Sequence, residues 1–164
     1  MFEPHTSSLI LVSACLAGLT TRYDGRALPA HSAVAALDPA RVLALCPEVL
    51  GNLPTPRPPA RFADARPGHE GEDVLAGRAR LLDAMGRDVS AAFIAGAREA
   101  LGLALAAGVG QAWLKDRSPS CAHDPRGANP LGGPRQGVLT ALLLAHGIKV
   151  VEMRLSASPS PLAR

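Results

Sequence analysis

The chain has 164 residues, of which 48% are apolar, so it is long enough for one domain with a hydrophobic core and too apolar for a disordered protein. Aromatic residues make up only 3%, which argues against a stacking platform for single-stranded nucleic acid. The formal net charge is +3 and the arginines are scattered, so nucleic acid is not an expected partner.

The N-terminal segment has no positively charged region before its apolar stretch, which argues against a secretory signal. The apolar stretch is also too short to cross a bilayer. We therefore expect a cytoplasmic protein without membrane contact, in which a reducing environment keeps the three cysteines as thiols.

The first third of the chain predicts two buried strands with a helix between them. Residues 8–15, SLILVSAC, form a short apolar run rich in branched side chains. After a loop, residues 31–38 have the pattern of a helix. A second buried strand is expected over residues 41–49 and should end near Cys46, because the proline that follows cannot donate a hydrogen bond to a neighbouring strand.

The middle of the chain is rich in proline and glycine. Residues 51–62 contain four prolines and are expected to be extended, without strand or helix. Residues 63–77 are polar and glycine-rich, which favours a mobile loop. Residues 78–89 are expected to form a small extended excursion.

The second half predicts helices that alternate with strands. Its elements are a helix from Asp88 or Ser90 to about Gly108, a strand over 110–116, a helix over 136–147 and a strand over 148–153. This alternation predicts a single three-layer α/β domain over residues 1–155, with a mainly parallel sheet of about four strands. Residues 156–164 are expected to be a disordered tail.

Each cysteine follows a predicted strand. Cys15 ends the first strand, Cys46 ends the second, and Cys121 lies five residues beyond the third. Ligands of parallel α/β sheets bind at the carboxyl ends of the strands, so three thiols from separate loops are expected to converge in one pocket. A free cysteine is also commonly a small buried hydrophobe, which is the alternative for each residue taken alone.

Three converging thiolates favour a soft metal. Zinc would need a fourth ligand, which His123 could provide, and an iron–sulfur cluster also takes thiolates. A cubane held by three cysteines leaves one iron open to substrate. The chain has no pair of cysteines with two residues between them, so the spacing does not decide between these metals.

Five segments resemble successive blocks of the thiouracil desulfidase family, a widespread bacterial family. They are ILVSACLAGLTTRYDG, ALCPEVLGNLPTPRPPA, GRDVSAAFIAGA, WLKDRSPSCA and QGVLTALLLAHGIKV, which together span about residues 9–153. The resemblance implies a Rossmann-like domain and a [4Fe-4S] cluster on Cys15, Cys46 and Cys121. It also implies iron–sulfur-dependent, non-redox conversion of a small thiolated pyrimidine, such as thiouracil, to uracil and hydrosulfide.

The chain departs from that family at three places. Related chains often have a second cysteine at the position of Thr21 and a glutamate at that of Arg61. Most continue after SPSC with a glycine and an aromatic-bearing segment, whereas this chain continues AHDPRGANPLGGPRQG. The pocket wall beside Cys121 should therefore differ.

Hydrolytic removal of sulfur needs a base and a proton donor. Glu48, two residues beyond Cys46, is the first choice as base, and Ser118 and Ser120 could hydrogen-bond the substrate or the attacking water. Candidate substrate-binding residues are Asp24, Tyr23 and Lys115. Each has a structural alternative, such as an Asx turn for Asp24 or capping of a turn for the serines.

Three other functions remain open. The enzyme could act on thiouridine in RNA, which should require a broad basic surface. The chain could be a non-enzymatic module that binds zinc or a cluster. It could also transfer sulfur through Cys121 as a nucleophile, with the thiol pKa lowered by Lys115 and Arg117.

Overall fold

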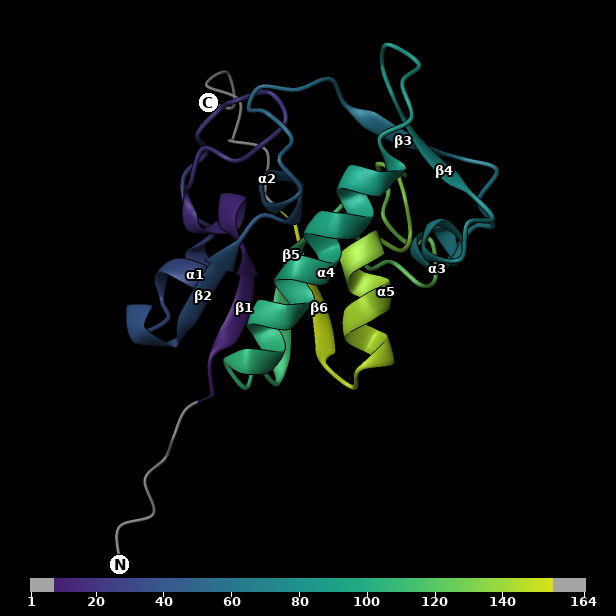
Figure 1. Cartoon of the computed structure of the whole chain (residues 1–164). Coiled ribbons are helices and arrows are strands. Elements are labelled where there is room, and N and C mark those ends of the chain that lie inside the picture. The colour runs from purple at the N-terminus through teal and green to yellow at the C-terminus, as the bar shows by residue number, and fades with distance from the viewer. Residues whose placement is uncertain (1–7, 155–164) are drawn as a thin grey trace, which may run out of the picture.

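A four-stranded parallel sheet forms the centre of the computed structural model, which describes residues 8–154 (Figure 1). The strand order is β2-β1-β5-β6, where β1 is Ile10–Ser13, β2 is Val42–Leu45, β5 is Gln111–Lys115 and β6 is Lys149–Met153. Every neighbouring pair is parallel. The predicted α/β domain with about four parallel strands is therefore confirmed. The three strands that precede the cysteines are neighbours, with β1 between the other two.

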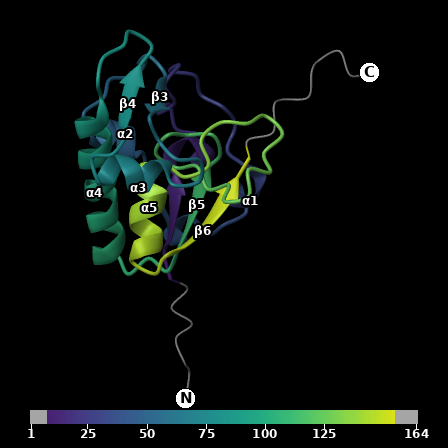
Figure 2. The ribbon, with the colours of Figure 1, turned by 90° about the vertical axis from the view of Figure 1, so that its right-hand side faces the viewer.

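Helices cover both faces of this sheet. On one side lie the long helix α4 (Ser90–Ala106) and α5 (Val138–Ala145); on the other lies the short helix α1 (Ser32–Ala35), as Figure 2 shows. The larger core packs between α4, α5 and the sheet, with Phe93, Ala97 and Leu143 buried at its centre. A smaller core joins Ile10 and Val34 on the other face. These faces form the three expected layers.

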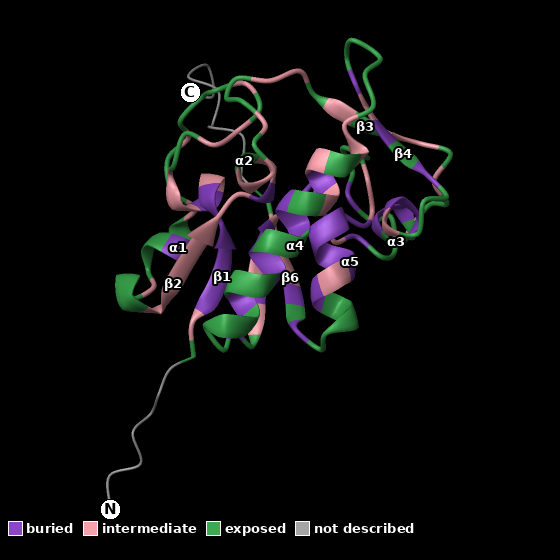
Figure 3. Ribbon diagram, viewed as in Figure 1, coloured by how far each residue is buried: buried purple, intermediate pink, exposed green. Residues whose placement is uncertain are grey.

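The central strand β1 is buried along its whole length, as Figure 3 shows. It pairs on both edges and is covered on both faces, so all four of its residues can be apolar or hydrogen-bonded. The edge strand β2 is only partly buried. The position of β1 inside the sheet, between β2 and β5, therefore explains the apolar run at residues 9–12.

Two predictions for the middle of the chain were wrong. Residues Ala60–Ala63 form β3, which pairs antiparallel with β4 (Arg80–Asp83) outside the main sheet. The expected loop over residues 63–77 contains a helix, α3 (Glu70–Leu75). The strand at residues 60–63 forms because the end of the proline-rich stretch pairs with β4, which lies in the extended excursion predicted over residues 78–89.

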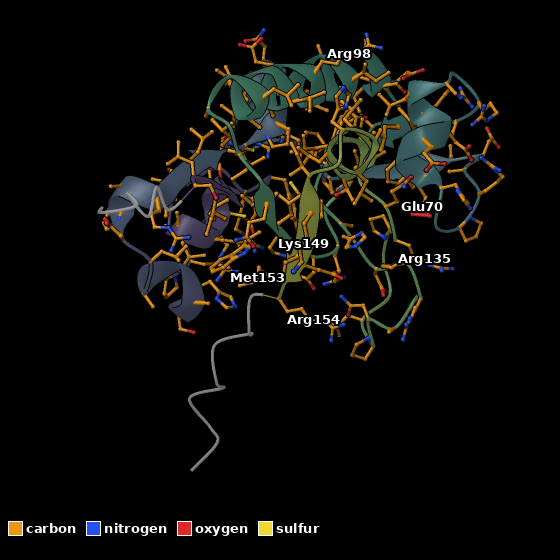
Figure 4. All side chains as sticks on the ribbon, turned by 90° about the horizontal axis from the view of Figure 1, so that it is seen from below. Glu70, Arg98, Arg135, Lys149, Met153 and Arg154 are labelled. Atoms are coloured by element: carbon orange, nitrogen blue, oxygen red, sulfur yellow. The ribbon has the colours of Figure 1, made fainter. Side chains whose placement is uncertain are left out.

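Contacts with the segment before α5 stabilise α3. The backbone N–H groups of Arg135 and Gln136 donate to Glu70 Oε2 at 2.6 and 2.9 Å, and Figure 4 shows Glu70 and Arg135 on the same side of the molecule. A Cβ on Gly71 would lie 2.3 Å from the Gly137 carbonyl oxygen, so the two segments meet with backbone nearly touching backbone. Tertiary contacts therefore override the loop-like composition of residues 63–77.

The remaining elements are short and lie around β1 and β2. A 3₁₀ helix, η1 (Ala14–Ala17), follows β1; η2 (Pro39–Arg41) precedes β2, and α2 (Pro47–Leu50) follows it. Cys15 thus lies in η1 rather than at the end of the strand, and the predicted helix over 31–38 is reduced to α1. Residues 156–164, the expected tail, lie outside the described residues. Within residues 8–154, no helix has the length and apolar character needed to cross a bilayer.

Candidate active site

A cavity of about 930 Å³ lies at the carboxyl ends of β1, β2 and β5. All three cysteines line it, and we call it the cysteine cavity. Its walls come from η1, the loop over residues 18–31, the start of α2 and the turn after β5. This is the edge of the sheet at which parallel α/β proteins bind ligands, and it lies at the top of the molecule in Figure 1.

The three thiols are free and line the same cavity. Cys121 is buried, while Cys15 and Cys46 are partly buried. Burial, opposed by the positive charge of Lys115 and supported by the neighbouring Cys46, raises the pKa of Cys15 to about 11. The pKa of Cys121 is also raised, first by burial and then by Cys46 and Cys15. The predicted convergence of the thiols in one pocket therefore holds in the structure.

The electrostatics do not support Cys121 as an activated nucleophile. The sulfur-transfer alternative requires Lys115 and Arg117 to lower the pKa of this thiol, but burial raises that pKa strongly. A buried thiol with a raised pKa is a poor nucleophile in the absence of a metal. The expectation of a lowered pKa was wrong, because the turn that follows β5 places Cys121 beneath the protein surface.

Backbone packing holds the turn that carries Cys121. Ser118 Oγ accepts hydrogen bonds from the N–H groups of Ser120 and Cys121, both at 3.2 Å. The Thr140 hydroxyl donates to the Cys121 carbonyl at 3.0 Å. A Cβ on Gly137 would lie 2.2 Å from the Ser120 carbonyl carbon, so the segment before α5 presses directly on this turn. Ser118 therefore caps the turn as well as lining the cavity.

Glu48 lies in the first turn of α2 and lines the cavity. Its Oε1 accepts a hydrogen bond from Arg57 Nε at 3.0 Å, and the Ser120 hydroxyl donates to its Oε2 at 3.4 Å. Ser120 is fully buried and is not among the residues that line the cavity. Its hydroxyl therefore reaches Glu48 from behind the cavity wall rather than from inside the cavity.

The other candidate residues lie in different positions. Lys115 lines the cavity, and its ammonium donates to the carbonyl and to Oδ1 of Asp116, both at 2.9 Å. Tyr23 lines the mouth and is 45% exposed. Asp24 is not among the lining residues. It forms an Asx-type contact with the Arg26 N–H and an ion pair with Arg22, and this hydrogen-bonded pair lowers the pKa of Asp24.

His123 and Arg61 lie outside the cysteine cavity. His123 pairs with Gln136 in an isolated bridge, and Arg61 is exposed on β3. Thr21, where related chains often have a cysteine, does line the cavity, and its carbonyl accepts from the Cys46 thiol at 3.9 Å. The departure at Thr21 therefore changes the cavity, whereas the departure at Arg61 does not.

Sequence reasoning missed several residues of the cavity wall. Arg57, His31 and Asp116 all line it. Arg57 belongs to the string PTPRPPA, but no rule of spacing connects it to Glu48 nine residues earlier. Only the path of the proline-rich segment across the cavity brings the two side chains together.

A family model with the description 2-thiouracil desulfurase matches residues 10–154. The chain belongs to the 2-thiouracil desulfurase family. The match covers β1 through β6 and includes all three cysteines. The resemblance seen in the five sequence segments is thereby confirmed.

Two proteins illustrate the relatives of this 2-thiouracil desulfurase family member. The chain is 35% identical over 146 residues to uncharacterized protein YbbK of Bacillus subtilis (strain 168), in an alignment that covers 87% of this chain and 94% of YbbK. Among solved structures it is similar to the [4Fe-4S]-dependent thiouracil desulfidase TudS, at 41% identity and a TM-score of 0.67, with 88% of this chain and 90% of TudS covered. Both alignments span nearly the whole domain.

The cysteines of this family member suit a cluster better than a single ion. Within residues 8–154, no three His, Cys, Asp or Glu side chains approach closely enough to hold one metal ion. Ligands of a cubane bind different irons, so its thiolates need only surround a common space, as the three thiols of the cysteine cavity do. Since His123 is not among the lining residues, the zinc arrangement with that histidine has no support.

Proposed function

We propose that this protein removes sulfur from a small thiolated pyrimidine, such as thiouracil, at a [4Fe-4S] cluster held by Cys15, Cys46 and Cys121. The observation that carries the proposal is that three free thiols from three separate loops line one cavity. The similarity to TudS supports the same cofactor and substrate. Because the chain has three cysteines, one iron would have no cysteine ligand from this chain.

When bound, such a cluster supplies a Lewis-acidic iron for the soft sulfur of a thiocarbonyl. The overall change is hydrolysis: water replaces sulfur on the ring carbon, the carbon–sulfur bond breaks, a carbon–oxygen bond forms, and sulfur leaves as hydrosulfide. Carbon, sulfur and iron keep their oxidation states, so no external electron donor is required. The attacking water must lose a proton, so the protein must supply a base.

Glu48 is the better placed of the two carboxylates that line the cysteine cavity in the described part of the chain. Both oxygens of the other, Asp116, accept side-chain hydrogen bonds, from Lys115 and from Asn129. Glu48 Oε1 is used by Arg57, but Oε2 meets only the long contact to the Ser120 hydroxyl. In this proposal Glu48 Oε2 takes the proton of the attacking water, and the hydroxyl of Ser120 holds that oxygen in place.

The remaining polar residues of the cavity bind and orient the thiolated pyrimidine. Ser118 and Lys115 lie beside Cys121 and Cys15 on the wall, where a hydroxyl and an ammonium can donate to a ring carbonyl. Tyr23 lies at the mouth, where its ring can pack against a pyrimidine. Asp24 acts indirectly, because it pairs with Arg22 beside Tyr23.

The experiment is an assay of the anaerobically reconstituted protein. We expect a brown protein with about four irons and matching acid-labile sulfide per chain, which releases uracil and sulfide from 2-thiouracil or 4-thiouracil. A colourless protein with one zinc would favour a metal-binding module instead. Release of sulfide from thiouridine in RNA, without turnover of the free bases, would favour the RNA substrate.

A further inference from the structure

Arg57 lies between the candidate base and the loop that closes one side of the cysteine cavity. Its side chain is 6% exposed. Nε donates to Glu48 Oε1 at 3.0 Å, while a terminal nitrogen, Nη2, donates to the Thr21 carbonyl at 2.8 Å. The guanidinium thus joins α2 to the loop over residues 18–31. Its partners Glu48 and Thr21 lie 9 and 36 residues before Arg57 in the chain.

The donors of this guanidinium are almost all occupied by protein groups. Besides Glu48 and Thr21, the other terminal nitrogen donates to the Pro54 carbonyl at 3.2 Å and to Thr55 Oγ1 at 3.0 Å. A guanidinium has five N–H donors, so four are already used. Arg57 therefore has little capacity left to bind an anionic ligand, although it lines the cavity.

The backbone of Arg57 strengthens the same connection. Its N–H donates to the Tyr23 carbonyl at 2.7 Å. The Thr21 carbonyl that accepts from the guanidinium also accepts from the Cys46 thiol at 3.9 Å. Arg57 consequently contacts Tyr23 at the mouth and Glu48 on α2 directly, and it is linked to Cys46 through the shared Thr21 carbonyl.

We infer that Arg57 is a positioning residue for Glu48. By holding Oε1, the guanidinium fixes the plane of the carboxylate, so that Oε2 faces Ser120 and the cavity. The inference rests on the proposed function, in which Glu48 is the base. Misplacement of a reacting group by about 1 Å can lower a rate about 100-fold, so a residue that sets this orientation has a large effect without touching the substrate.

The planar fork of arginine is essential to this role. It reaches Glu48, Thr21 and the Pro54–Thr55 segment at once, whereas a lysine ammonium is a compact point charge on a flexible stem. We therefore expect Arg57→Lys to retain the positive charge and lose the orientation. Its kcat should fall about 10-fold to 100-fold with KM changed by less than about 3-fold.

The test compares Arg57→Lys, Arg57→Gln and Arg57→Ala with Arg61→Ala, which removes an exposed arginine of β3 outside the cavity. Each reconstituted variant is assayed for iron content, kcat and KM on 4-thiouracil. Guanidinium at millimolar concentration should raise kcat of Arg57→Ala at least about 5-fold and leave the other variants unchanged, because it can refill the vacated site. Arg61→Ala should match the wild type.

A second measurement does not depend on the cluster. Crystal structures of the metal-free wild type and Arg57→Gln should show Glu48 Oε2 beside Ser120 Oγ in the first and rotated away in the second. An unchanged Glu48 in the variant, or an Arg57→Lys kcat within about 2-fold of the wild type, would overturn the inference. Loss of activity that follows loss of iron, without rescue by guanidinium, would overturn it as well.

Failure of the inference and failure of the proposed function give different results. If the wild-type holoprotein releases no sulfide from thiouracil, the proposed function fails, and the crystal structures alone decide whether Arg57 orients Glu48. If the wild type and all Arg57 variants are equally active while Glu48→Gln is inactive, the function stands and the positioning role is excluded.

Discussion

The Ser120 hydroxyl lies 3.4 Å from Glu48 Oε2, although the two residues are 72 positions apart in the chain. Ser120 is fully buried, and Glu48 lines the cysteine cavity with its side chain 14% exposed. The contact joins the turn after β5 to the start of α2 and therefore connects the regions that carry Cys121 and Cys46. A serine that cannot reach the cavity can in this way influence a carboxylate that does.

Glu48→Gln keeps the size of the side chain and removes its capacity to take a proton. We expect kcat on thiouracil to fall about 10²-fold to 10⁴-fold while iron content stays at the wild-type level. The matched control is Glu99→Gln, which changes an exposed glutamate of α4. Wild-type kcat in the iron-loaded Glu48→Gln protein would remove Glu48 from the mechanism.

Replacement of any one cysteine with serine should abolish stable cluster binding. The predicted result for Cys15→Ser, Cys46→Ser and Cys121→Ser is loss of the brown colour and a drop from about four irons per chain, since a serine hydroxyl is a poor ligand for iron. Met85→Ala is a suitable control, because it removes a sulfur atom at a side chain 73% exposed and outside the cavity. Full iron content in one serine variant would show that this thiol is not a ligand.

Gly96 sets the approach of α4 to α2, the helix that carries Glu48. A Cβ at Gly96 would lie 1.8 Å from the Pro47 carbonyl oxygen, so Gly96→Ala must push the two helices apart. We expect it to lower the free energy of unfolding by about 1–3 kcal/mol and to reduce activity through displacement of α2. Urea denaturation measures the first effect.

The control for that prediction lies on the same helix. Gly102 is exposed, and a Cβ there would meet no other segment of the described chain within 4 Å. Gly102→Ala should therefore raise stability by about 0.5–1 kcal/mol through helix propensity alone. If both variants are stabilised, the close contact between α2 and α4 is not required for folding.

Asp73 should make stability depend on pH in the acidic range. Its buried carboxylate accepts hydrogen bonds from the Arg66 side chain at 2.7 Å, from the Arg66 N–H at 2.9 Å and from Arg78 at 3.1 Å. These bonds, those of the Arg66 side chain foremost, hold the pKa of Asp73 well below its ordinary value of 3.8. A lowered pKa stabilises the fold above the unfolded-state value, and this contribution is lost as pH falls below it.

Thermal unfolding at a series of pH values tests this effect. Asp73→Asn should lower Tm at neutral pH, and the difference from the wild type should shrink as pH falls below 3.8. Asp64→Asn, at a carboxylate 73% exposed, should follow the wild-type curve at every pH. A difference for Asp73→Asn that is constant across the pH range would show that packing, not charge, explains it.

The sequence alone determined the main features of the sheet and the place of the cysteines. Short apolar runs predicted β1, β2, β5 and β6, because the strands of a parallel sheet with helices on its faces are mostly apolar. The spacing of apolar residues predicted α4. Since parallel strands end at the same edge of a sheet, the strand ends were enough to predict that Cys15, Cys46 and Cys121 line one pocket.

Only the tertiary structure decided the polar contacts of the site and the elements that depend on distant partners. Helix α3 forms in a glycine-rich segment because Glu70 binds backbone groups before α5, and Arg57 meets Glu48 because the proline-rich segment crosses the cavity. Ser120 faces Glu48 rather than the cavity because the backbone at Gly137 packs closely against the turn that carries Ser120. Hydrophobic periodicity is a local property of the chain, whereas each of these contacts depends on where another segment lies.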